Sequence, residues 1–258
     1  METSSVKFFL IPSILLGLSI YGSVKLGAET YERVKANDQT ISVTGSADRT
    51  ITSDSVKWTG SFGRSADAVG LKDGNVAMKN DLAAVLKLLH ARGVKDGQIT
   101  IQPMSISPIC AGQQNMPYYD RNGGPTCGTS SVSGYNLQQG IMVESPNVKD
   151  VTKLAQEAPT SLVQDGILFT SVNLEYYYTK LGDLKLEMLS EATKNAKDRA
   201  QKIAETTGSK IGKPQSAGMG VFQVTAPNSV DVSDYGTYDT ASMEKKVTSV
   251  VRMSFLLE

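Results

Sequence analysis

Residues 183–208 read DLKLEMLSEATKNAKDRAQKIAETTG and carry the clearest helical pattern of the chain. Asp183 is suited to begin this helix and Gly208 to end it. Between them, apolar and small side chains recur every three to four residues and share one helix face: Leu184, Met188, Ala192, Ala196, Ala200, Ile203 and Ala204. Alanines at four-residue spacing let a helix backbone approach a sheet or a second helix closely. We favour packing in the chain's own core over a contact between subunits.

Alternating apolar and polar residues on both sides of this helix predict strands. These segments are Thr40–Gly45, Ser55–Phe62, Gln98–Gln102, Tyr135–Val143, Val172–Tyr178, Ala217–Thr225 and Val247–Leu257. Two more helices are expected. One runs from Ser65 to about Arg92 with Val76, Leu82, Val85, Leu86 and Leu89 as its apolar stripe, and the other begins at Asn147, with Pro159 indicating an early or broken end.

The order of these elements predicts an α+β fold, with helices packed on antiparallel sheets. The two flanks read ββα and αββ, and together they could complete one sheet. The part between them, roughly residues 104–182, is then an inserted subdomain. The body of the protein is expected to span residues 39–258, after a polar spacer at residues 29–38.

The composition excludes several classes of protein. The 258 residues contain 26 Lys and Arg against 26 Asp and Glu, so the formal net charge is zero. A nucleic-acid-binding protein needs a surplus of basic side chains, and we expect no such partner. A single His and two Cys exclude a His-rich metal site and a Cys-rich zinc module. We expect neither a metal nor a cofactor.

The N-terminus contains an uncharged run, Phe8–Val24, bracketed by Lys7 and Lys25. It extends to Ala28 if the Lys25 side chain reaches toward the membrane surface, and about 20 apolar residues span a bilayer. A cut after Ala28 or after Ser23 would place a large residue at the −3 position of a signal-peptide site. We therefore expect residues 1–28 to be an uncleaved signal anchor with the body on the exported side. A cleaved signal peptide and a buried core helix are the alternatives.

The two cysteines, Cys110 and Cys127, enclose a stretch rich in Gly, Pro, Asn and Gln that is typical of a surface loop. In an oxidising compartment they are expected to form a disulfide across this loop. Two free thiols in a cytosolic protein are the alternative.

Few residues offer chemistry. His90 lies near a helix end, and a general base there would need a carboxylate that the sequence does not place. Asp231, Asp234 and Asp239 lack the regular spacing of a calcium loop, so a solvated loop is favoured. Tyrosines gather in the two longest loops and make those loops plausible contact surfaces: Tyr118, Tyr119, Tyr235 and Tyr238. We expect no catalytic residues.

Several strings, taken in order, resemble the SIMPL domain family, the YggE-like exported proteins of bacterial envelopes. They are ISVTG (Ile41–Gly45), LLHARGVKDGQITIQP (Leu88–Pro103), SGYNLQQGIMV (Ser133–Val143), VKDVTKLAQ (Val148–Gln156), Gly166–Phe169 and EATKNAKDRAQKIAETTGSKIGK (Glu191–Lys213). The chain departs from the family in Ser53-Asp54, where Pro-Asp is common, and in its longer cysteine loop. The resemblance implies an envelope location, an inserted ferredoxin-like βαβ part, ring- or channel-like homo-oligomers and a role connected with stress.

Three functions follow as hypotheses. The first is a non-enzymatic envelope protein, membrane-anchored or exported, whose body assembles into a homo-oligomer larger than a dimer. The second is a binding module that presents its tyrosine-bearing loops to an envelope partner. The third is an envelope enzyme of unknown substrate. Leftover sheet edges and exposed aromatic side chains favour the first.

Overall fold

The computed structural model describes residues 16–31, 39–112, 118–119, 125–127 and 131–258. The chain divides into two compact units. Unit 1 comprises Met1–Asp48, Lys185–Phe222 and Thr248–Glu258, and unit 2 comprises Arg49–Leu184 and Gln223–Val247. Helices and antiparallel sheets make up the fold, so the predicted α+β class is confirmed. The subdomain boundary at residues 104–182 and the spacer at residues 29–38 stay predictions.

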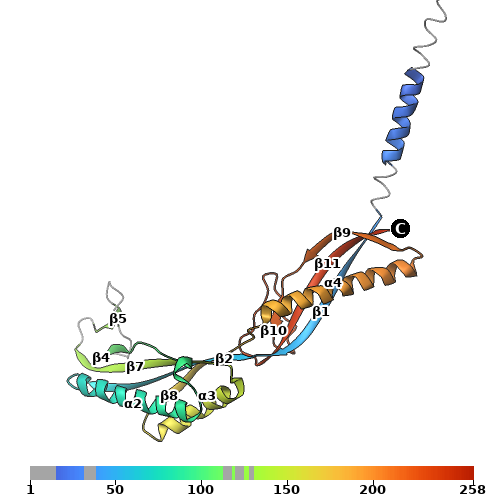
Figure 1. Ribbon diagram of the computed structural model, residues 1–258. Helices are drawn as coiled ribbons and strands as arrows, with labels where there is room; N and C mark the ends of the chain where they lie inside the picture. The colour runs from blue at the N-terminus through green and yellow to red at the C-terminus, as the bar shows by residue number, and fades with distance from the viewer. Residues whose placement is uncertain (1–15, 32–38, 113–117, 120–124, 128–130) are drawn as a thin grey trace, which may run out of the picture. The chain divides into compact units, whose positions relative to one another are not determined.

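In unit 1, strand β11 (Glu244–Leu257) lies between β1 (Thr40–Thr52) and β9 (Ile211–Met219). Helix α4 (Leu181–Thr206) lies along this sheet (Figure 1). Three contacts define the register of β1 on β11. The Leu257 N–H donates to the Gln39 carbonyl at 2.9 Å, the Ser42 and Ser254 hydroxyls lie 3.3 Å apart, and the Thr248 hydroxyl donates to Asp48 at 2.6 Å. Residue numbers fall along β11 as they rise along β1, so the pair is antiparallel.

The alanine face of α4 packs on β1 of the same chain, so the stripe serves core packing, the use that the sequence favoured. Ala192, Ala196 and Ala200 are fully buried. A Cβ atom at Gly45 of β1 would lie only 2.3 Å from both the Ala192 carbonyl oxygen and the Ala196 nitrogen. Glycine and alanine therefore bring the two backbones into direct contact. Ile203 was expected on this face, but it is 48% exposed, because it lies to one side of the row that contains the buried Ala200 and Ala204.

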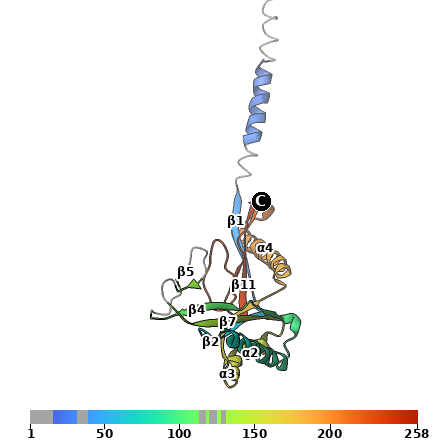
Figure 2. The same cartoon turned by 90° about the vertical axis from the view of Figure 1, so that its left-hand side faces the viewer.

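Unit 2 contains an antiparallel sheet whose strands lie in the order β3–β7–β2–β8, and β4 also pairs with β7. Figure 2 shows α2 and α3 on one side of β2 and β7. The strands and helices are β2 (Ser55–Asp67), α2 (Leu71–Ala91), β3 (Ile99–Ile101), β4 (Ser105–Cys110), β7 (Val132–Ser145), α3 (Val148–Val163) and β8 (Leu168–Tyr177). A short 3-10 turn, Asp96–Gln98, precedes β3.

The core of unit 2 lies between the sheet and these two helices. Trp58 and Phe62 of β2 are almost completely buried, and the Trp58 ring centroid lies 5.8 Å from that of Phe169. The indole N–H of Trp58 donates to the Ser171 hydroxyl at 3.2 Å, so its one polar group is satisfied. The other core side chains include Val56, Met78, Val85, Leu89, Leu137, Ile141, Val143, Val151, Leu154 and Leu162.

Three sequence-based expectations about elements were wrong. A helix was expected to begin at Ser65, but β2 continues to Asp67 because it pairs with β7 along its whole length, and α2 begins at Leu71. Val76 of the expected stripe is 52% exposed, and Met78 is buried instead. Helix α3 does not break at Pro159, since the buried Ala158 and Leu162 on either side hold it in the core.

The final strands also differ from expectation. Residues 217–225 were predicted as one strand, but β9 begins at Ile211 and ends at Met219, and β10 (Gln223–Thr225) is separate. Strand β11 begins at Glu244 rather than Val247 because it pairs with β1 and β10 as well as β9. The earlier start brings Lys245 into the strand.

Residues 16–31 form a helix at the start of the described chain (Figure 1). Within the part of the chain that the structure describes, no helix has both the length and the apolar character needed to cross a membrane. The predicted anchor begins at Phe8, and residues 8–15 lie outside the described residues.

Candidate interaction surface

The loop that joins β10 to β11, residues 226–242, is ordered by backbone hydrogen bonds although it contains no regular strand or helix. The Val224 N–H donates to the Thr237 carbonyl at 2.9 Å, and the Asp239 N–H donates to the Val224 carbonyl at 2.8 Å. The Tyr176 N–H donates to the Thr240 carbonyl at 2.8 Å and ties the loop to β8. We refer to this segment as the 226–242 loop.

A buried glutamine fixes the middle of this loop. The Gln223 side chain is 8% exposed, and its amide nitrogen donates to the Ser233 carbonyl at 2.7 Å. Its amide oxygen accepts from the backbone N–H of Thr237 at 2.9 Å and from the Thr237 hydroxyl at 2.8 Å. One side chain therefore joins two loop positions, and it sits on the adjoining strand rather than on the loop.

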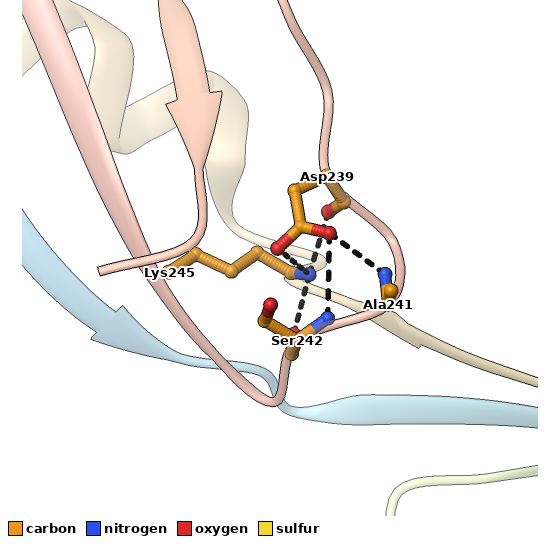
Figure 3. A network of polar contacts seen from close by, with 4 residues as sticks. All are labelled: Asp239, Ala241, Ser242 and Lys245. Atoms are coloured by element: carbon orange, nitrogen blue, oxygen red, sulfur yellow. Dashed lines mark hydrogen bonds and ion pairs between the residues drawn. The ribbon is translucent and has the colours of Figure 1, made fainter. Parts of the chain in front are cut away.

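A buried lysine fixes the end of the loop (Figure 3). Lys245 is fully buried, and its Nζ donates to the carbonyls of Asp239 and Ser242, both at 2.6 Å. Asp239 Oδ1 accepts from the backbone N–H groups of Ala241 at 2.9 Å and Ser242 at 3.4 Å. Asp239 Oδ2 lies 3.8 Å from Nζ and is buried without a hydrogen-bond partner among the described residues.

The electrostatics of this cluster follow from burial. Burial lowers the pKa of Lys245, and the charge of Asp239 opposes that effect. For Asp239, burial alone would raise the pKa, but hydrogen bonds from Ser242 and Ala241 and the charge of Lys245 together hold it below its usual value. Both groups are engaged inside the protein, so the cluster serves as an anchor for the loop.

The anchored loop presents large apolar side chains to solvent. Val230, Val232 and Tyr235 are 92%, 81% and 96% exposed, and Tyr238 is about half exposed. A turn at Gly236, whose φ of 84° suits glycine, follows Tyr235. Apolar surface concentrated on one loop is a common mark of a contact site. These geometric features make the 226–242 loop a candidate contact surface.

The three acidic residues considered for calcium do not share one site. Asp231 accepts a hydrogen bond from the Ser229 hydroxyl at 2.9 Å, whereas Asp239 belongs to the lysine cluster. In the described chain, no group of three or more His, Cys, Asp or Glu side chains is placed to hold a metal ion.

The first tyrosine-bearing loop is held by a disulfide. Cys110 and Cys127 are bonded, with their Cα atoms 5.4 Å apart, so the predicted disulfide is confirmed. The backbone at Tyr118–Tyr119 forms β5, which pairs with β6 (Pro125–Thr126). The side chains of Tyr118 and Tyr119 lie outside what the structure describes, so their role as contact residues stays a prediction.

His90 does find a carboxylate. Its Nε2 lies 2.8 Å from Asp96 Oδ1 at the C-terminal end of α2. The two side chains are 45% and 93% exposed. A general base acts best where water is excluded and its pKa is tuned by burial. This pair lies on an open surface at the helix end where the sequence placed His90.

Asp54, in the Ser53-Asp54 pair that departs from the common Pro-Asp, has a structural role. Its carboxylate accepts from the Thr179 N–H at 2.7 Å and from the Thr179 hydroxyl at 2.8 Å. The turn between β1 and β2 is thereby tied to the chain that enters α4.

Sequence reasoning missed Gln223 and Lys245, which hold the loop. Lys245 shares the inward face of β11 with Val247, Val251 and Met253, which are all buried. Buried positions alternate with outward-facing ones along this strand, so a lysine at one of the apolar, inward-facing positions indicates a buried cation.

A comparison with protein families identifies the family of this chain. The model of SIMPL, described as a protein of unknown function (DUF541), matches residues 41–255. No curated protein matches the chain.

Proposed function

Because the chain belongs to the SIMPL family, whose function is unknown, we propose its role from its structure: a non-enzymatic envelope protein whose body assembles with copies of itself through the 226–242 loop. The observation that carries this proposal is the exposure of Val230, Val232 and Tyr235 on an ordered loop. Such side chains gain from burial at about 25 cal/mol per Å² of apolar surface. A rigid loop also loses little conformational entropy when it binds.

The disulfide supports the location. The Cys110–Cys127 bond persists in an oxidising compartment such as the periplasm and is unusual in the cytosol. The uncharged run Phe8–Val24 would anchor the exported body in the inner membrane, or direct its export and then be removed. Fractionation distinguishes these two cases. The anchored form stays full-length in the pellet after a carbonate wash, whereas the cleaved form is shorter and soluble.

The native mass of the full-length chain in mild detergent tests self-assembly. We expect a mass larger than that of a dimer at micromolar concentration. The variant Val230→Ser, Val232→Ser, Tyr235→Ser should fall toward the monomer mass. The matched control replaces three apolar residues elsewhere in unit 2, Val69, Val76 and Val163, which are 93%, 52% and 51% exposed, by Ser.

The outcomes separate the hypotheses. A monomer mass for the unaltered chain would refute self-assembly and favour a binding module that presents the loop to another envelope component. An unchanged large mass in the loop variant would place the contact elsewhere. A lower native mass in both triple variants would show that the loss of assembly is not specific to the loop.

A further inference from the structure

In unit 1, strand β1 is a sheet edge. The Leu257 N–H of β11 donates to the Gln39 carbonyl, so the backbone groups of the odd-numbered residues face β11. The groups of the even-numbered residues therefore point away from β11. Two of them confirm this assignment because they bind side chains of α4. Arg199 donates to the Thr44 carbonyl at 3.1 Å, and the Ser46 N–H donates to Asn195 at 3.1 Å.

Helix α4 protects only part of this edge. Its two contacts occupy Thr44 and Ser46, and side chains that cover an edge strand prevent unwanted pairing. By the same parity both the N–H and the carbonyl of Ser42 point away from β11, and β1 is the end strand of its sheet. Backbone groups in this arrangement can pair with an added strand.

A groove lies beside the open part of the edge. It has a volume of about 560 Å³ and is lined by Ser42, Val43, Thr44, Asp198, Arg199, Lys202 and Ile203. Ile203, which the helix pattern assigned to the core, is half exposed here. Arg199 and Lys202 supply cationic groups beside the Asp198 carboxylate, and Lys202 also pairs with Glu205 at 3.4 Å. A fitting strand would present both apolar and acidic side chains to it.

The 226–242 loop contains a segment with this chemistry. Residues 229–234 read SVDVSD, an alternation with the period of a strand. In an extended conformation Val230, Val232 and Asp234 share one face, and Asp231 lies on the other. The two valines are among the most exposed apolar side chains of the described chain. The segment belongs to no sheet. Its ends are held, because the Ser229 N–H donates to the Ala226 carbonyl and the Ser233 carbonyl accepts from Gln223, whereas the Asp231 N–H donates to the Ser229 hydroxyl at 3.0 Å.

We propose that residues 230–232 of one copy add as a short strand to the β1 edge at Ser42 of a second copy, while the Ser233 carbonyl stays bound to Gln223. Val230 and Val232 then pack on Val43 and Ile203, and Asp234 faces Arg199 and Lys202. This inference rests on the proposed self-assembly and names its contact. The two surfaces differ, so the contact is head-to-tail. It produces a ring where the rotation closes and a filament where it does not.

Disulfide trapping between two differently tagged full-length chains tests this contact. One chain carries Ser42→Cys and the other Asp231→Cys. Odd-numbered residues of β1, such as Val43 and Gly45, face α4, so the Ser42 side chain lies on the opposite face. The side chain at position 231 joins it there, and directly opposed residues have Cβ atoms about 5 Å apart. The native cysteines are already bonded to each other and do not interfere.

The matched control is Val232→Cys in place of Asp231→Cys. In a strand its side chain points to the other face, so we expect several-fold more crosslinked product with position 231 than with position 232. Heterotypic tags show that the product joins two copies. A second variant, Ser42→Pro, removes the outward N–H and should lower the native mass, since an edge position tolerates proline.

The results distinguish the two proposals. A large native mass with equal or no crosslinking at positions 231 and 232 would overturn this contact and leave self-assembly standing. A monomer mass for the unaltered chain would overturn both. Unchanged mass in Ser42→Pro, with circular dichroism showing an intact fold, would also refute pairing at this edge.

Discussion

Replacing Lys245 by Met should release the 226–242 loop while leaving the rest of unit 2 folded. Methionine keeps the length and apolar volume of the lysine stem, so the change creates little empty space. It removes the Nζ donors that bind the carbonyls of Asp239 and Ser242 at 2.6 Å. It also leaves the partly buried Asp239 carboxylate, whose Oδ2 atom is buried, without its cation.

The size of the effect follows from these lost partners. A buried acceptor left unsatisfied costs about 1–3 kcal/mol, and removing one member of a buried ion pair costs about 3–5 kcal/mol. The variant also avoids the desolvation free energy of a buried ammonium group. The same desolvation lowers the pKa of Lys245. We expect a net loss of roughly 3 kcal/mol in the stability of the loop, which corresponds to a change of more than about 100-fold in its opening equilibrium.

Amide hydrogen exchange of the full-length chain, read by mass spectrometry, measures this opening. The amides of Asp239 and Tyr176 should exchange at least about 100-fold faster in Lys245→Met, whereas amides of the β2–β7 pair should not change. Lys246→Met is the control, because that side chain lies on the outer face of β11 and is half-buried. Equal protection in Lys245→Met and the unaltered chain, or equal loss in both variants, would refute the anchoring role.

Two further predictions concern close packing and acid stability. Gly45→Ala should lower the free energy of unfolding by about 1–3 kcal/mol in a urea titration, because the new Cβ would collide with the α4 backbone at Ala192. Gly218→Ala is the control. Its Cβ meets open space, so its free energy of unfolding should change by less than about 0.5 kcal/mol. The pKa of Asp239 is lower in the folded than in the unfolded protein, so its contribution is present above pH 3.8 and is lost as the pH falls through the folded value. Asp239→Asn should therefore lose less stability than the unaltered chain on acidification, and parallel pH profiles would contradict this.

The predictable parts of the fold are those governed by periodicity. The alanine row of α4 indicated a close approach, and the structure places Gly45 against it. The start of α2 was not predictable, because Ser65 is a good cap and only the long pairing partner β7 keeps it in a strand. A helix-interior proline such as Pro159 usually ends a helix. Burial of the neighbouring side chains reverses that rule here, and burial is a property of the tertiary structure.

The candidate surface was only partly predictable for a related reason. Composition indicated a tyrosine-bearing contact loop, and Tyr235 is indeed exposed. The groups that hold the loop lie outside it, on Gln223 and Lys245, and act through backbone carbonyls that have no sequence signature. The unpaired stretch of β1 could not be predicted either. Whether the odd- or the even-numbered backbone groups of β1 face β11 depends on the register of the two strands, which the sequence does not reveal.

The anchoring of the 226–242 loop itself argues for a contact role. Among the described residues, the core of unit 2 includes Met243 at its margin but no residue of the loop. The loop therefore adds little to the core, yet it is fixed by a buried glutamine and by a buried lysine, a group that is costly to desolvate. Such order reduces the entropy that binding must overcome. A binding surface requires an ordered loop that exposes apolar side chains to solvent. A simple connection between two strands requires neither this order nor these exposed side chains.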